Sequence, residues 1–119
     1  MKFSGRVIKG LGRGEKTGFH TMNLNPKRVP VSLVHGIYAV RVKTPIGSFN
    51  GVAHFGPRPT HGAGISFEVH AFGLRKNIWR KNVEVEIVEP RIRTIRHFKS
   101  EKALTKAIQS DIAKAKKCL

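Results

Sequence analysis

The sequence predicts a mainly β fold: a six-stranded antiparallel, Greek-key-like barrel with one C-terminal α-helix packed on it. Two patterns lead to this expectation. Six short segments up to about residue 90 have the apolar alternation or the turn boundaries of strands, and a final segment has helical spacing. At 119 residues we expect a single domain over 1–119, with the barrel at about 3–90 and the helix at about 100–116.

Proline and glycine separate the first four predicted strands. These strands cover residues 3–9, 19–24, 36–43 and 48–55. Pro26 and Pro30 interrupt regular structure after the second strand. Residues 44–47 suit a tight turn because proline stands at the second position. We favour this turn over Asn50-Gly51, which apolar residues flank too closely for two strands to begin there.

The last two predicted strands are amphipathic. Residues 65–72 alternate, and their polar face carries Ser66, Glu68 and His70. Residues 83–88 also alternate, so Val83, Val85 and Ile87 face inward, whereas Glu84 and Glu86 are expected to be solvated charges.

The C-terminal segment has the features of a helix. Ser100 is a plausible N-cap, and lysines near the end suit the negative end of the helix dipole. The face at helical spacing is apolar except at Asp111; it consists of Leu104, Ala107, Ile108, Asp111, Ile112 and Ala115. We therefore expect an amphipathic helix lying against the barrel.

The charge is strongly basic, with 23 Lys and Arg against 7 Asp and Glu and a formal net charge of +16. Such a field attracts polyanions, so either a solvated basic surface or a nucleic-acid patch is consistent with it. The chain has no apolar run of about 18 residues, and its single cysteine, Cys118, cannot form an internal disulfide. We expect a monomeric cytoplasmic protein with no membrane contact.

Residues 10–23 are the strongest candidate for a nucleotide site. Alternating glycines let backbone N–H groups approach an anion closely, and they stand at Gly10, Gly12 and Gly14 with Lys16 after them. Thr21 and Asn23 place neutral oxygens two residues apart, which could hold Mg²⁺ beside phosphates. The stretch matches neither the Walker A nor the Rossmann pattern, so a simple hairpin loop is the competing interpretation.

Glu68 is the only carboxylate between residues 16 and 83. A general base for proton transfer would need such a residue near the phosphate site. An ordinary surface glutamate paired with a lysine is the alternative, and the residues alone favour it.

The order of four blocks resembles the riboflavin kinase (flavokinase) family, which occurs alone or as the C-terminal module of bifunctional FAD synthetases. The blocks are GRVIKGLGRGEKTGFHTMNL at 5–24, GIYAVRV at 36–42, GVAHFGPRPT with FEVHAF between 51 and 72, and RIRTIRHFKSEKALTKAIQSDIAKA at 91–115. The resemblance implies a six-stranded barrel with a terminal helix. It also implies transfer of the ATP γ-phosphate to the 5′-hydroxyl of riboflavin, giving FMN and ADP.

The resemblance assigns roles by position. Thr21 and Asn23 would bind Mg²⁺ and phosphates, Glu68 would be the general base, and Arg93 would border the flavin. The nucleotide would lie against Gly10, Gly12, Gly14 and Lys16. With the resemblance added, the catalytic interpretation of Glu68 is the favoured one.

Five residues depart from the family pattern. His20 and Met22 replace the proline and alanine of its Pro-Thr-Ala-Asn motif, Ile95 replaces an acid, and Trp79-Arg80 replaces Tyr-Gly. Two other functions remain open at this point. One is a small basic barrel that binds nucleic acid without catalysis, and the other is a degenerate relative that binds flavin without turnover.

Overall fold

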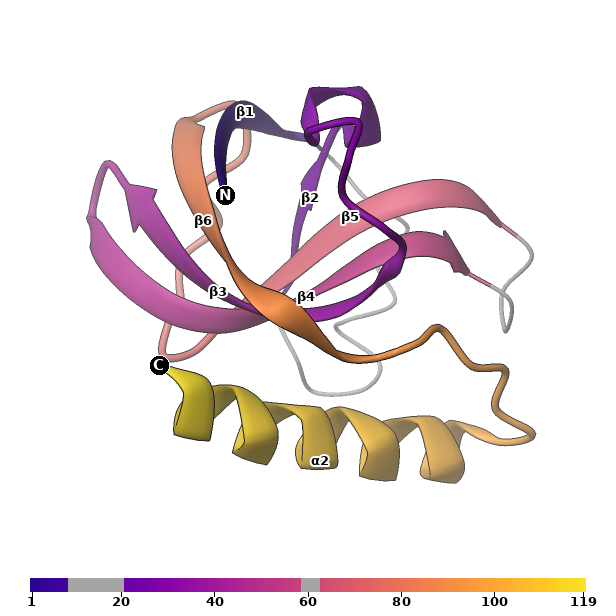
Figure 1. Cartoon of the computed structure of the whole chain (residues 1–119). Helices are drawn as coiled ribbons and strands as arrows, with labels where there is room; N and C mark the ends of the chain where they lie inside the picture. The colour runs from indigo at the N-terminus through magenta and orange to yellow at the C-terminus, as the bar shows by residue number, and fades with distance from the viewer. Residues whose placement is uncertain (9–20, 59–62) are drawn as a thin grey trace.

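The structure is a closed antiparallel barrel with a helix lying across its outer surface (Figure 1). It is a computed structural model that describes residues 1–8, 21–58 and 63–119. Its described strands are β1 (Lys2–Ile8), β2 (Met22–Leu24), β3 (Gly36–Thr44), β4 (Gly47–Arg58), β5 (Ala63–Ala71) and β6 (Asn82–Arg93). The short 3₁₀ helix η1 (Pro26–Arg28) follows β2, and α2 (Glu101–Cys118) ends the chain. The predicted fold class is confirmed.

The strands close in the order β1-β2-β5-β4-β3-β6. Strands β3, β4 and β5 are successive antiparallel neighbours, and β6 returns beside β3, which is the Greek-key arrangement. The turn predicted at residues 44–47 is confirmed, because Thr44 pairs with Gly47 and Gly47 has φ +136°. Asn50 lies within β4 opposite Arg41, so Asn50-Gly51 is not a turn.

The barrel interior holds the main core. Alternate residues of each strand point inward, and the fully buried large side chains include Val7, Leu24, Tyr38, Phe67 and Val85. The rings of Phe3 and Phe67 meet edge to face with centroids 5.0 Å apart. Burying each side chain of this size contributes about 1.5–3 kcal/mol of stability. The face of each strand that carries the alternating apolar residues therefore turns inward.

Strand β6 is longer than the sequence predicted. We expected it to end at residue 88, before Pro90, whereas it extends to Arg93. The reason is a register shift against β3: Val88 lies opposite Ala39, but Arg93 lies opposite Ile37. A bulge of this kind leaves extra residues outside the regular ladder, where proline can be accommodated.

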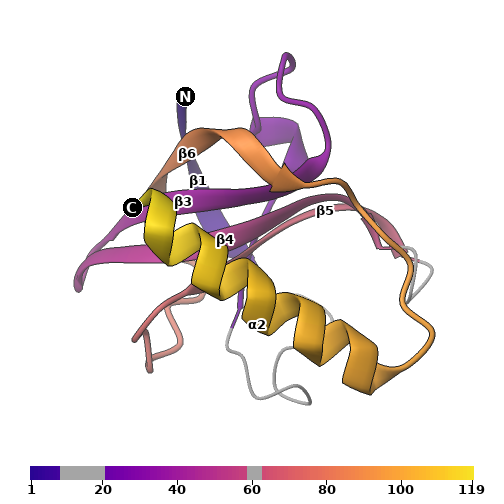
Figure 2. The same ribbon diagram turned by 60° about the horizontal axis from the view of Figure 1, so that its bottom comes forward.

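Helix α2 crosses the outer surface of the barrel over β3 and β4 (Figure 2). The Ser100 side chain accepts a hydrogen bond from the backbone N–H of Ala103 at 3.1 Å, which confirms the predicted N-cap. Ala115 and Ile112 pack against Ile37, Ala39 and Val52 in a second apolar cluster. None of the described helices is long and apolar enough to cross a membrane.

Candidate active site

A row of polar residues crosses three neighbouring strands on the outer face of the barrel. Glu68 on β5 is directly opposite Asn23 on β2 and directly opposite His54 on β4. The adjacent row, formed by Leu24, Phe67 and Phe55, is buried in the interior. Since successive side chains on a strand point to opposite faces, the polar row faces outward.

Glu68 is held against the protein surface. The residue is half-buried and its Oε1 atom is buried, so the carboxylate does not project freely into solvent. Directly opposed residues on antiparallel strands have Cβ atoms about 4.5–5.5 Å apart, which is within reach of a shared small ligand. The register therefore brings the side chains of Asn23 and His54 to either side of the carboxylate.

Thr21 and Asn23 lie at the beginning of β2. Both are half-buried; Thr21 directly precedes the strand, and Met22 between them is buried in the core at 4% exposure. The structure thus brings Asn23 next to Glu68 and leaves Thr21 two residues away along the chain. A hydroxyl and an amide oxygen are ligands that Mg²⁺ accepts. The candidate residues Gly10, Gly12, Gly14 and Lys16, together with His20, lie outside the described residues.

Arg93 lies further along the same row of strands. Glu68 is opposite His54, His54 is opposite Ile37, and Ile37 is opposite Arg93. Three strand spacings separate Glu68 from Arg93, which is on the order of 14 Å along the sheet. A ligand in contact with both residues would have to be extended.

The Arg93 guanidinium has close contacts within the protein. Its Nε and Nη2 donate to Oδ1 and Oδ2 of Asp111, both at 2.8 Å, and Nη1 donates to the carbonyl of Thr94 at 3.0 Å. The guanidinium also lies over the Phe98 ring, 5.4 Å from its centroid. These contacts attach α2 to the end of β6, and they explain why Asp111 interrupts the apolar face of the helix.

Sequence reasoning did not single out His54 as a neighbour of Glu68. The strand alternation could have placed His54 on the outer face, but its partner depends on the β4–β5 register.

The structure also places two of the residues that depart from the family pattern. Ile95 packs in the cluster beneath α2, and Trp79 is 49% exposed in the segment between β5 and β6.

Comparison with known proteins gives a consistent set of similarities. The family model described as riboflavin kinase (Flavokinase) matches residues 1–119. The chain is 41% identical over 114 residues to the bifunctional riboflavin kinase/FMN adenylyltransferase of Haemophilus influenzae, covering 94% of this chain and 36% of that protein. It is 33% identical over 112 residues to the RNA-binding riboflavin kinase RibR of Bacillus subtilis, covering 92% of this chain and 47% of that protein.

A solved structure is similar as well. It is described as a macrolide-efflux protein from Streptococcus pneumoniae, and it matches with a TM-score of 0.79 and 28% identity over 92% of this chain and 36% of that one. The chain therefore spans between about a third and a half of the length of the proteins named here.

Proposed function

The chain belongs to the riboflavin kinase family, and we propose that it transfers the γ-phosphate of ATP to the 5′-hydroxyl of riboflavin, giving FMN and ADP. The observation that carries the proposal is the direct opposition of Asn23 and Glu68 on the outer face of the barrel. It places a candidate cation ligand beside a candidate base. A barrel that only binds nucleic acid has no need of this pairing.

Glu68 is proposed as the general base. Its carboxylate would accept the proton of the riboflavin 5′-hydroxyl as the hydroxyl oxygen bonds to the γ-phosphorus. The bond from that phosphorus to the bridging oxygen breaks in the same transfer, and ADP leaves with the electron pair. A positioned base typically contributes about 10²–10⁴-fold to the rate, while most of the remaining acceleration comes from positioning and charge neutralisation.

Thr21 and Asn23 are proposed to hold the divalent cation together with the ATP phosphates. Their neutral oxygens match the hard-ligand preference of Mg²⁺, and they sit beside the proposed base. Bound Mg²⁺ would neutralise charge on the phosphates. Gly10, Gly12, Gly14 and Lys16 are proposed to contact the nucleotide, the glycines through backbone N–H groups and the lysine through its ammonium.

Arg93 is proposed to border the flavin. Its position in the row of Glu68 and His54, several strands away, is compatible with an extended substrate whose reactive hydroxyl lies at the Glu68 end. Because Asp111 and Thr94 accept hydrogen bonds from this guanidinium, its place is well defined before any ligand arrives.

The test is an assay of FMN formation from riboflavin, ATP and Mg²⁺. Glu68→Gln should reduce kcat by about 10²–10⁴-fold with an unchanged melting temperature. Glu84→Gln is the matched control, because it removes the same charge from the outer face of β6, opposite Ser4 and Lys43. Full activity in Glu68→Gln would remove the base role, and a wild-type chain that forms no FMN would overturn the proposal as a whole.

A further inference from the structure

One end of the barrel carries a concentration of positive charge that the proposed kinase chemistry does not use. We define this basic end by four exposed side chains: Arg6, Arg28, Arg80 and Lys81. They come from three segments, residues 1–8, 24–33 and 72–82, and none of these segments contains an aspartate or glutamate. The cations therefore have no acidic neighbour along their own chain segments.

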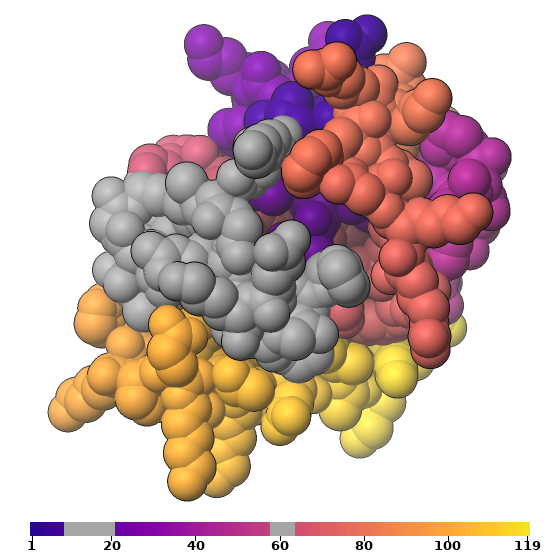
Figure 3. Space-filling model, turned by 180° about the vertical axis from the view of Figure 1, so that it is seen from behind, coloured from indigo at the N-terminus to yellow at the C-terminus, as the bar shows by residue number. Residues whose placement is uncertain are grey.

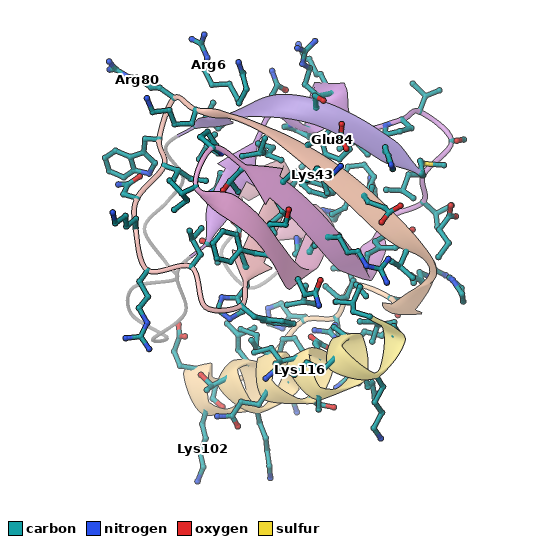
Figure 4. The ribbon with its side chains drawn as sticks, turned by 90° about the vertical axis from the view of Figure 1, so that its left-hand side faces the viewer. Arg6, Lys43, Arg80, Glu84, Lys102 and Lys116 are labelled. Atoms are coloured by element: carbon teal, nitrogen blue, oxygen red, sulfur yellow. The ribbon has the colours of Figure 1, made fainter. Side chains whose placement is uncertain are left out.

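Backbone contacts hold these segments together. The N–H of Val7 donates to the carbonyl of Lys81 at 2.9 Å, and the N–H of Arg80 donates to the carbonyl of Val7 at 2.8 Å. Arg28 reaches the same strand, since its Cγ is 3.9 Å from where a Cβ on Gly5 would stand. Figure 4 shows Arg6 and Arg80 projecting from one end of the molecule, whereas Lys102 on α2 projects from the other.

Acids accompany the cations elsewhere on the sheet. Among the described residues, ion pairs join Arg41 to Glu86 at 3.3 Å and Arg93 to Asp111 at 2.8 Å. Lys43 lies opposite Glu84 on β6. Arg6 lies opposite Asn82, and Glu84 is the next outward residue of β6. Within the part of the chain that the structure describes, no ion pair joins an acid to the basic end, so its positive potential is available to a polyanion.

Arg80 adopts a backbone conformation that favours glycine. Its φ is +67°, in the left-handed region that disfavours residues with a Cβ. Glycine would meet no such penalty there, so an arginine at this position carries a conformational cost that a glycine would not. What the side chain adds is a charge directed into solvent beside Arg6.

Trp79 precedes Arg80 and is 49% exposed. An exposed tryptophan among arginines and lysines has the composition of a surface on which an unpaired base stacks while the cations contact phosphates. Figure 3 shows the coral-coloured segment around residue 80 at the surface on the right of the molecule, with α2 in orange and yellow along the bottom.

We propose that the basic end binds single-stranded nucleic acid, with Arg6, Arg80 and their neighbours contacting phosphates and Trp79 stacking on a base. RNA and single-stranded DNA share this chemistry. Arg6 lies two residues before Ile8, which is opposite Asn23, so this surface adjoins the proposed kinase site. Its test measures nucleic-acid binding and not FMN formation.

The first experiment measures the affinity for a fluorescein-labelled oligouridine of about 12 nucleotides at several KCl concentrations. Arg6→Gln/Arg80→Gly should weaken binding at least about tenfold near physiological salt and reduce the slope of log K against log salt by about 1.4. The matched control, Lys102→Gln/Lys106→Gln, removes two exposed charges from α2 and should change affinity less than about twofold. Equal losses in the two variants, or no wild-type binding at that salt, would overturn the proposal.

The melting temperature of each variant serves as the control for folding. Arg80→Gly alone relieves the left-handed strain, so it should leave the melting temperature unchanged or higher.

The second experiment uses the fluorescence of Trp79 as the probe, since it is the only tryptophan of the chain. Oligouridine should quench its fluorescence, and polyglutamate of similar charge should not. Equal quenching by polyglutamate would assign the surface to acidic partners in general, and unchanged fluorescence with oligouridine would contradict stacking; either result overturns the proposal. DNA of matching sequence in a parallel titration identifies which nucleic acid is preferred.

Discussion

Asn23 on β2 and Glu68 on β5 lie directly opposite each other, and both face the outside of the barrel. The two residues are far apart in the sequence, and the antiparallel pairing of β2 with β5 brings them together. The pairing gives the proposed cation ligand and the proposed base a common location.

Asn23→Ala should raise the Mg²⁺ concentration required for half-maximal FMN formation by at least about tenfold, because one oxygen ligand is lost. The measurement is an initial-rate titration with Mg²⁺ at saturating ATP and riboflavin. Asn50→Ala is the control, since Asn50 lies on β4 opposite Arg41, away from the polar row. An unchanged Mg²⁺ requirement in Asn23→Ala would contradict the ligand role.

Removing one partner of the Arg93–Asp111 ion pair should cost more free energy of unfolding than the intact pair contributes by its net attraction. The Asp111 side chain is 5% exposed and that of Arg93 is 17% exposed. Asp111→Leu should therefore lower the free energy of unfolding by about 3 kcal/mol, since it leaves the guanidinium partly buried without its partner. Arg93→Leu/Asp111→Leu should recover a large part of this loss.

Urea denaturation of both single variants and the double variant measures the coupling between them. Additive losses would show that the two side chains do not act as a pair. The same double variant tests the flavin proposal, because a specific rise in KM for riboflavin with an unchanged KM for ATP is expected if Arg93 borders the flavin.

Gly51→Ala should destabilise the barrel. A Cβ at Gly51 would collide with the backbone oxygen of His70 and lie 3.2 Å from Cα of Ala71, and strand backbones cannot yield as a flexible side chain can. We expect a loss of about 2–3 kcal/mol in the free energy of unfolding. Gly64→Ala is the matched control on β5; no described atom lies within 4 Å of its Cβ, so a change within about 0.5 kcal/mol is expected.

Tyr38 should make stability depend on alkaline pH. Burial raises the pKa of its phenol, Glu89 raises it further, and Arg91 lowers it; the hydroxyl donates to the carbonyl of Val34 at 2.6 Å. Because the folded pKa is above the unfolded value of about 10, the contribution is fully present below pH 10 and is lost as pH rises toward the folded pKa.

Tyr38→Phe should lack this alkaline loss, although it should cost about 1 kcal/mol at neutral pH through the missing hydrogen bond. Tyr38 is the only tyrosine in the chain, so ultraviolet titration of the phenolate reports on it alone. The folded protein should titrate at a higher pH than the urea-unfolded chain. Coincident titrations would contradict the predicted shift.

Short-range patterns were sufficient to predict most of the fold. The alternation of residues 36–43 predicted β3, Pro45 and Gly47 predicted the turn after it, and Ser100 predicted the start of α2. Each of these features depends on neighbours within a few positions of the chain, so the physical cause is present in the local sequence.

The tertiary structure decided what local patterns leave open. Register placed His54 beside Glu68, a shift between β3 and β6 carried β6 beyond Pro90, and the docking of α2 joined Asp111 to Arg93. The sequence by itself predicted most of the strands and the helix, and its resemblance to a family supplied the roles proposed for Thr21, Asn23 and Glu68. It did not determine which of these residues meet, because strand pairing depends on loop closure and on the packing of distant segments in a shared core.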